Sequence, residues 1–143
     1  MAAAMQNRNM LRHASAFDVP GIRALMQTVP GFWQSGWSEE TIADAIRSAN
    51  GLAFVWESGG SILGFVCAHD LGFRAYLSEL IVDARVRKQG IGKNLVNGVE
   101  EALRDRGQRV LIADVWRDAV PFYRSLGWDA PEAVLLRRRI DPR

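Results

Sequence analysis

A glycine-containing turn at residues 87–93 most constrains the fold, because it joins an apolar segment directly to an amphipathic one. Residues 76–82, before the turn, are mostly apolar and predict a buried strand. After the turn, apolar side chains recur every four residues and predict a helix from about residue 91 to 106, whose apolar face is formed by Ile91, Leu95, Val99 and Leu103. A helix with one apolar face needs a surface to cover, so we expect a sheet with helices packed on it.

The other apolar segments predict the remaining elements of this sheet and its helices. Asp18 and Ser38 are residue types that cap helix starts, but the capping box of Ser38 is expected to be incomplete, because Thr41 is neither Glu nor Gln. The segment 58–61 reads Ser-Gly-Gly-Ser and predicts a hairpin loop. The order of elements predicts an α/β fold (α+β, with a mixed sheet) covered on both faces. The predicted strands are 10–13, 52–57, 62–69, 76–82, 110–115 and 134–140, and the further helices are 18–27, 38–49 and about 118–127.

Composition is that of a globular protein, with 48% hydrophobic and 24% charged residues among 143. We expect one domain over residues 1–143, with its core at about 10–140. The formal net charge of +2 favours an anionic small molecule as a partner. The one basic run, Arg137–Arg139, is interpreted as a solvated strand end, so no nucleic acid is expected.

Cys67 is the single cysteine and lies in an apolar stretch, so it is interpreted as a core residue in a reducing compartment. The first residues contain no apolar stretch long enough for a signal peptide. No run approaches the ~18 apolar residues of a membrane span. The sequence therefore predicts a cytoplasmic protein that needs no membrane.

The turn at residues 87–93 has the residue types that bind a phosphate group. Its glycines let the backbone approach a ligand, and the amides at a helix start point toward an anion. Arg87, Lys88 and Lys93 add positive charge. A Walker loop would need Ser or Thr at Asn94, and a dinucleotide fingerprint would need a small residue at Leu95, so both are excluded. The alternative is an ordinary strand-to-helix turn with incidental glycines.

Four segments, taken in order, resemble the GCN5-related N-acetyltransferases (the GNAT family). Residues 87–92 match the [Arg/Gln]-x-x-Gly-x-[Gly/Ala] motif of this family, which grips the pyrophosphate of CoA. Residues 11–18 are similar to the family's start, residues 79–82 to its fourth strand, and residues 119–128 to its second signature. The resemblance implies a single acyl-CoA N-acyltransferase domain with a central, mostly antiparallel sheet flanked by helices, and acetyl-CoA as cofactor. The cofactor-binding residues that it implies are Leu80, Ile81, Val82, Arg87, Lys88, Gln89, Gly90, Ile91, Gly92, Lys93, Trp116, Phe122 and Tyr123.

By the same resemblance, the enzyme transfers an acetyl group from acetyl-CoA to a primary amine by direct attack in a ternary complex. Glu79 is expected to be the general base, with His69 and Asp70 as alternatives, and a solvent-facing strand residue is the other interpretation of Glu79. Tyr123 is expected to give a proton to the leaving thiolate, or else to pack beneath the cofactor. A strand amide near Val82, freed by a bulge, is expected to polarise the thioester oxygen.

The resemblance places the acceptor site beside the loop between the first two helices. Aromatic rings there can enclose an amine, or can instead form a lid or a dimer contact. One departure from the family is Trp116, which stands where an asparagine often contacts the pantetheine arm. The expected partner is a small-molecule or protein amine, the oligomeric state is a monomer or homodimer, and no metal is expected. The alternative function is a catalytically idle acyl-CoA-binding sensor or regulatory module. The substrate-binding candidates are Phe32, Trp33, Trp37, Arg74 and Tyr76.

Overall fold

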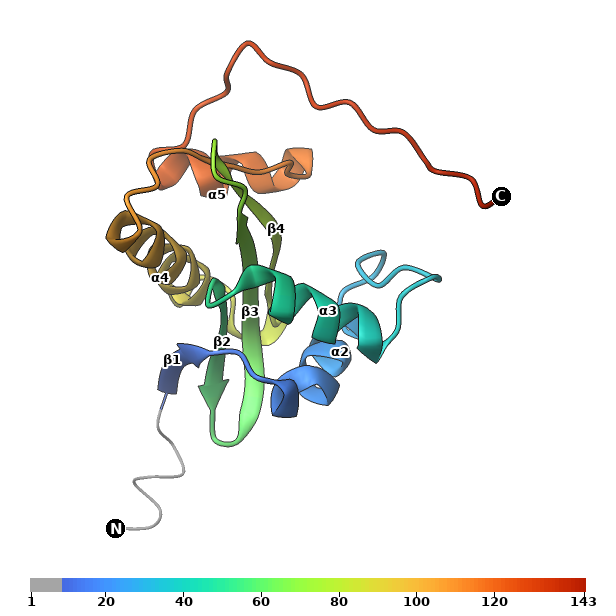
Figure 1. Cartoon of the computed structure of the whole chain (residues 1–143). Helices are drawn as coiled ribbons and strands as arrows, with labels where there is room; N and C mark the ends of the chain where they lie inside the picture. The colour runs from blue at the N-terminus through green and yellow to red at the C-terminus, as the bar shows by residue number, and fades with distance from the viewer. Residues whose placement is uncertain (1–8) are drawn as a thin grey trace. The chain divides into compact units, whose positions relative to one another are not determined.

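The computed structural model describes residues 9–143, which form two compact units. The first unit ends at Ala113 and the second runs from Asp114 to Arg143, and each is described by itself. That residues 1–143 form one domain therefore stays a prediction. The elements of the first unit (Figure 1) are β1 (Asn9–His13), η1 (Ala16–Asp18), α2 (Val19–Gln27), α3 (Glu39–Ala49), β2 (Ala53–Ser58), β3 (Ser61–Asp70), β4 (Ala75–Val82), η2 (Ala84–Val86), α4 (Ile91–Asp105) and β5 (Leu111–Ile112).

The first unit is built on a five-stranded sheet in the order β1-β2-β3-β4-β5. The first four strands pair antiparallel with their neighbours, and β5 joins β4 in parallel. The β2–β3 hairpin turns through Gly59 and Gly60, whose φ angles of 56° and 83° suit a two-residue turn. The predicted mixed, mostly antiparallel sheet is confirmed.

Helices cover both faces of this sheet, and strand β3 shows which helix covers which face. A Cβ built on Gly64 would meet Leu95 and Ile91, so that side of β3 packs on α4. Cys67, three residues later and therefore on the opposite side, approaches the backbone of Ala45 in α3. Figure 1 shows α4 on one side of the strands and α2 with α3 on the other.

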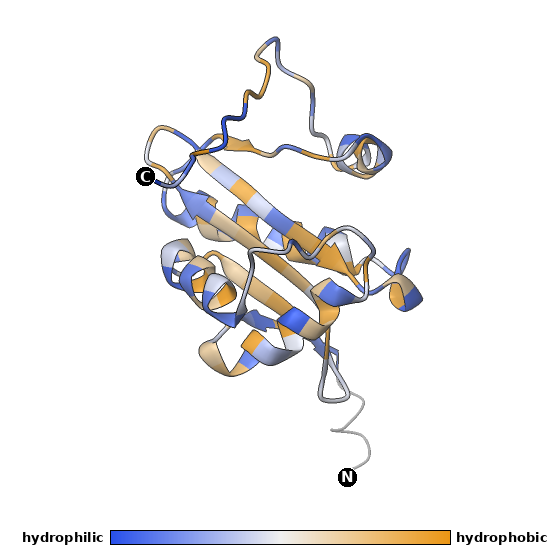
Figure 2. Cartoon of the chain, turned by 90° about the vertical axis from the view of Figure 1, so that its right-hand side faces the viewer, coloured by the Kyte–Doolittle hydropathy of each residue, from blue (hydrophilic) through white to orange (hydrophobic). Residues whose placement is uncertain are grey.

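The core lies between the sheet and these helices, and Figure 2 shows hydrophobic residues concentrated along the strands. The predicted apolar face of α4 is buried: Ile91, Leu95, Val99 and Leu103 are each at most 5% exposed. Cys67 is fully buried, and burial, with a smaller effect of the Glu79 charge, raises the pKa of its thiol to about 12. The interpretation of Cys67 as a core residue is confirmed.

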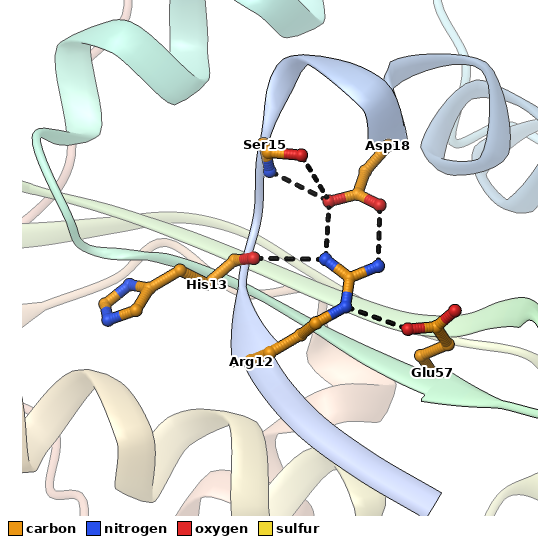
Figure 3. A network of polar contacts seen from close by, with 5 residues as sticks. All are labelled: Arg12, His13, Ser15, Asp18 and Glu57. Atoms are coloured by element: carbon orange, nitrogen blue, oxygen red, sulfur yellow. Dashed lines mark hydrogen bonds and ion pairs between the residues drawn. The ribbon is translucent and has the colours of Figure 1, made fainter. Parts of the chain in front are cut away.

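A charged network fastens β1 to the start of α2 (Figure 3). Two guanidinium nitrogens of Arg12 donate to the two carboxylate oxygens of Asp18, each at 2.8 Å, and its Nε donates to Glu57 at 2.8 Å. The backbone N–H of Ser15 also donates to Asp18. These interactions explain why Asp18, the predicted N-cap of α2, tolerates burial.

The expectation of an incomplete capping box at Ser38 is wrong. The backbone N–H of Ser38 donates to the Thr41 hydroxyl at 3.0 Å, so threonine replaces the usual carboxylate or amide. The oxygen of a short hydroxyl side chain still reaches the N-cap amide three residues back.

The second unit contains η3 (Arg117–Ala119) and α5 (Val120–Ser125). As predicted, Pro121 lies in the first turn of α5, and Gly127 follows the helix with a φ of 92°. The prediction of a strand at 134–140 is wrong, because residues 114–143, all of them described, include no strand with which it pairs. The predicted buried strand 110–115 is reduced to Leu111–Ile112 and is partly exposed, because it pairs with β4 alone at the edge of the sheet.

Candidate active site

The segment between β4 and α4 has a sharply turned backbone. Asp83 is buried, accepts from the backbone N–H of Arg85 and pairs with its guanidinium, which fixes the exit from the strand. Beyond η2, Lys88 and Gly90 have φ angles of 67° and 83°, so the backbone turns sharply before α4 begins. A Cβ built on Gly90 would meet nothing within 4 Å, so the space beside this glycine is open.

Helix α4 starts directly at this turn. The first intrahelical bond of the helix runs from the N–H of Asn94 to the carbonyl of Gly90, at 3.0 Å, so the preceding amides have no acceptor within the helix. The positive end of the helix dipole adds to the attraction of a phosphate. The side chains of Arg87, Lys88 and Lys93 are exposed beside these amides. Among the predicted cofactor residues 87–93, residues 87–90 and Lys93 are exposed, whereas Ile91 points into the core.

Strand β4 precedes this turn. Most of one edge of β4 is not paired with β5. In the described part of the chain, β5 pairs with Ala75 and Tyr76 and no further along β4. Leu80, Ile81 and Val82 remain regularly paired with β3 on the other edge. The backbone edge of these three predicted cofactor residues is therefore suited to hydrogen bonds with an extended ligand arm.

The bulge of β4 lies earlier in the strand than expected. The register moves from Cys67 opposite Glu79 to Ala68 opposite Leu77, which makes Ser78 the extra residue. Val82, where a bulge was expected, pairs regularly with Gly64. The hydroxyl of Ser78 donates to the carbonyl of Cys67 on the neighbouring strand at 3.2 Å, which supports the irregular pairing.

Three residues predicted for the site, His69, Tyr76 and Glu79, lie on one face of the sheet together with Cys67. Glu79 is opposite Cys67, and Tyr76 is opposite His69, so all four belong to the face that α3 covers. The predicted base Glu79 and the predicted acceptor residue Tyr76 are therefore brought to the same face. The loop between α2 and α3, which holds the predicted aromatic residues, joins two helices that pack on β3.

The three aromatic rings of this loop form one cluster. Trp37 meets Trp33 edge-on at 5.6 Å and Phe32 edge-on at 6.4 Å between ring centroids. The guanidinium of Arg23 lies 5.3 Å from the centre of the Trp33 ring, and Arg23 also pairs with Glu39. All three rings are half-buried, so the cluster has both a packed side and a side open to solvent.

Two other candidates lie in the β3–β4 turn. Asp70 accepts from the side chain of Gln108 and from the backbone of Gly72, and the Gln108 bond is the main cause of its lowered pKa. These bonds hold Asp70 as part of the turn. Arg74 is exposed there, and its carbonyl accepts from the N–H of Leu71 at 2.9 Å.

The second unit holds the remaining candidates. Tyr123 is buried, with Phe122 and Trp128 edge-on at 5.1 and 5.2 Å. Burial, followed by the negative charge of Asp114, raises the pKa of its phenol to about 12. Trp116 is 58% exposed and immediately precedes η3.

Across 9–143, no group of three or more His, Cys, Asp or Glu side chains is arranged to hold a metal ion. Within the same range, no helix has the length and apolar character required to cross a membrane.

The sequence model of the acetyltransferase (GNAT) family matches residues 21–128. The chain belongs to this family, as the resemblance predicted, and acetyl-CoA is the family's cofactor. The match begins in α2 and continues past α5, so it includes the turn at 87–93 and Tyr123.

Relatives and solved structures agree with this assignment. An uncharacterised N-acetyltransferase of Methanocaldococcus jannaschii is 32% identical in an alignment of 93 positions that covers 57% of this chain and 40% of that protein. The ribosomal-protein-S18-alanine N-acetyltransferase of Escherichia coli is similar with a TM-score of 0.73 and 26% identity, covering 84% of this chain and 77% of that one. PaiA N-acetyltransferase of Thermoplasma acidophilum, solved with coenzyme A, has a similar fold, with a TM-score of 0.77 and 17% identity over 89% and 93% of the two chains.

Sequence reasoning missed Ser48 and Ser78, the two hydroxyls that contact His69. The sequence gives no direct signal for Ser48, which is one polar residue among many on a solvated helix. Ser78 carries a weak signal, since it interrupts an otherwise largely apolar strand beside Glu79.

Proposed function

We propose that the protein is an acetyl-CoA-dependent N-acetyltransferase that acts on a primary amine by direct attack in a ternary complex. The observation that carries the proposal is the turn at 87–93, where Lys88 and Gly90 have positive φ between η2, which follows β4, and the start of α4. One domain over residues 1–143 is part of the proposal, supported by a family match that continues through both units.

The residues of the turn fit a pyrophosphate. The amides at the start of α4 would hold it, with Arg87, Lys88 and Lys93 nearby, and the edge of β4 at Leu80–Val82 would hold the pantetheine arm. Bound acetyl-CoA supplies an activated acetyl group as a thioester. Trp116, whose indole is exposed, is proposed to contact the arm in place of the usual asparagine because it stands at the asparagine's position in the family pattern.

Glu79 is proposed as the general base. An alkyl amine with a pKa near 10.4 is neutral in only about one molecule in ~2,500 at pH 7, so removing its proton costs about 4–5 kcal/mol. A carboxylate on the acceptor side lowers this barrier by taking the proton directly or through water. Support comes from the location of Glu79 beside the bulge and on the same face as Tyr76.

Tyr123 is proposed to assist the leaving thiolate. A phenol with a pKa of about 12 keeps its proton throughout the neutral range, so its hydroxyl is always available to donate. Because an ordinary thiol has a pKa of only about 8.5, complete transfer from this phenol is unfavourable. The proposed role is therefore hydrogen-bond donation to the sulfur as negative charge develops on it.

The acceptor is proposed to be an amine that approaches through the aromatic cluster. Trp33 already holds the Arg23 guanidinium near its ring, which supports the affinity of this cluster for cations. Among the neighbours named above, the Escherichia coli protein is the ribosomal-protein-S18-alanine N-acetyltransferase, whose acceptor is a protein amine. Nothing in the aromatic cluster of this chain selects a small molecule over a protein amine. A cytoplasmic location and a monomeric or homodimeric state are parts of the same proposal.

The competing function is a catalytically idle acyl-CoA-binding module. It shares the turn at 87–93, and it differs in giving no turnover with any amine. The presence of both Glu79 and Tyr123 favours the enzyme.

Two measurements test the proposal in order. First, acetyl-CoA should raise the melting temperature, because a ligand bound only to the native state at a hundredfold excess over Kd stabilises it by about 2.7 kcal/mol. Second, a panel of small amines, amino acids, aminoglycosides and peptides is screened for release of the CoA thiol. Binding with no release for any amine favours the idle module, whereas no binding at millimolar acetyl-CoA would falsify both functions.

A further inference from the structure

His69 is held between two hydroxyl groups that come from different elements. Its Nδ1 lies 3.0 Å from the Oγ of Ser48 in α3, and its Nε2 lies 3.0 Å from the Oγ of Ser78 in β4. Ser48 is exposed, and His69 and Ser78 are half-buried. The imidazole therefore connects the covering helix to the bulged residue of the strand.

The bond that Ser78 makes to the backbone decides which groups donate and which accept in these hydrogen bonds. Ser78 donates its single hydroxyl proton to the carbonyl of Cys67, which can only accept. The Ser78 oxygen must then accept from the Nε2–H of His69. A neutral imidazole with its proton on Nε2 has an acceptor at Nδ1, to which Ser48 donates. In this arrangement both ring nitrogens of His69 and the hydroxyls of Ser48 and Ser78 have hydrogen-bond partners.

This series of hydrogen bonds, from Ser48 through His69 to Ser78, ends where β4 is irregular. Ser78 is the extra residue of the bulge, and its hydroxyl satisfies the Cys67 carbonyl there. A bulge bends its strand and redirects the neighbouring side chain, which here belongs to Glu79. The Cys67 thiol donates to the carbonyl of Ala45 at 3.6 Å, and its sulfur is also 3.7 Å from the Nε2 of His69, so Ser78 is the nearer of two contacts of that nitrogen.

We propose that His69 is a positioning residue: braced by Ser48, it holds Ser78 and so fixes the β4 bulge and the direction of Glu79. The inference rests on the proposed acetyl transfer for its kinetic consequence, but the support of β4 by His69 is a separate physical claim. His69 touches no reacting atom in this role, and it moves no proton.

The test compares His69→Leu, which removes both ring nitrogens, with His69→Gln, whose side-chain amide can still donate to Ser78. The matched control is His13→Gln, because His13 is the other histidine, is exposed and stacks on Phe54 at the end of β1. Hydrogen exchange is followed in peptides that cover residues 76–82. Steady-state kinetics are measured with acetyl-CoA and the best amine from the panel.

We expect His69→Leu to exchange faster in residues 76–82 and to lose about tenfold in kcat, with the KM for acetyl-CoA within about twofold of wild type. His69→Gln should recover most of both, and His13→Gln should change neither. Wild-type exchange and kcat in His69→Leu would overturn the proposal. Equal kcat losses in the Leu and Gln variants, with normal exchange in the Gln variant, would also overturn it and indicate proton transfer by His69. If the wild-type protein binds acetyl-CoA but acetylates nothing, the proposed function fails, and hydrogen exchange alone still decides whether His69 supports β4.

Discussion

Replacing Asp18 by asparagine tests how much the charged network of Figure 3 stabilises the first unit. Asp18 is 7% exposed and accepts two bonds from Arg12 and one from the Ser15 amide, all at 2.8 Å. Asparagine has nearly the same shape but carries no charge, and its NH2 group faces donors. The substitution therefore removes the ion pair with little change in volume.

The expected loss follows from burial. Removing one partner of a buried ion pair costs about 3–5 kcal/mol, because the other charge is left uncompensated. Arg12 is about a third exposed and keeps its bond to Glu57 at 2.8 Å, so its remaining charge is largely compensated. We therefore expect the free energy of unfolding to fall by about 2–3 kcal/mol, which is more than an ordinary exposed substitution costs.

The assay is urea unfolding of wild type, Asp18→Asn and the control Asp44→Asn. Asp44 pairs with Arg47 on the exposed surface of α3, so its substitution should cost no more than ~0.5 kcal/mol. Arg12 lowers the pKa of Asp18, so this stabilisation is present above the ordinary carboxyl value of 3.8 and is lost as the pH falls through the lowered folded-state pKa. The difference between wild type and Asp18→Asn should therefore shrink from pH 7 to pH 2.5. Equal stability of the two at pH 7, or a difference that does not change with pH, would refute the reasoning.

Three further predictions concern the proposed chemistry. Tyr123→Phe should lower kcat by ~10²-fold with little change in acetyl-CoA affinity, because the hydrogen bond to the developing thiolate is lost. Because the phenol pKa is about 12, the defect should be the same from pH 7 to 9.5. A wild-type kcat, with chemistry shown to limit the rate, would show that the leaving sulfur needs no hydrogen bond from Tyr123. Glu79→Gln should be most impaired at pH 7 and recover toward the amine pKa of about 10.4, whereas a constant defect in kcat/KM removes Glu79 as the base. Gly92→Val should abolish acetyl-CoA binding in calorimetry while the circular dichroism spectrum stays native, because a branched side chain enters the phosphate path; wild-type affinity would place the pyrophosphate elsewhere.

The elements that the sequence predicted well are those with a strong local signal. The α4 helix was predicted to within one residue, because its apolar face repeats every four residues and Gly107 follows it. The β2–β3 hairpin was predicted because its two glycines accept positive φ. In both cases neighbouring residues in the sequence decide the structure.

The elements that were missed depend on partners distant in sequence. Residues 134–140 have the composition of a strand, but a strand exists only where another strand pairs with it. The Ser78 bulge is set by the register against Cys67 and Ala68, and no local pattern encodes that register. The His69 contacts likewise need α3 to pack on β3 and β3 to pair with β4, which only the three-dimensional structure reveals.

The central claim, direct acetyl transfer to an amine, is tested by initial-rate kinetics with both substrates varied and with mass spectrometry of the products. The account predicts one acetylated amine for each CoA released, intersecting double-reciprocal lines, and no acetyl group on the protein. Parallel lines together with an acetylated protein would contradict direct attack in a ternary complex. CoA release without an acetylated amine would contradict amine transfer itself.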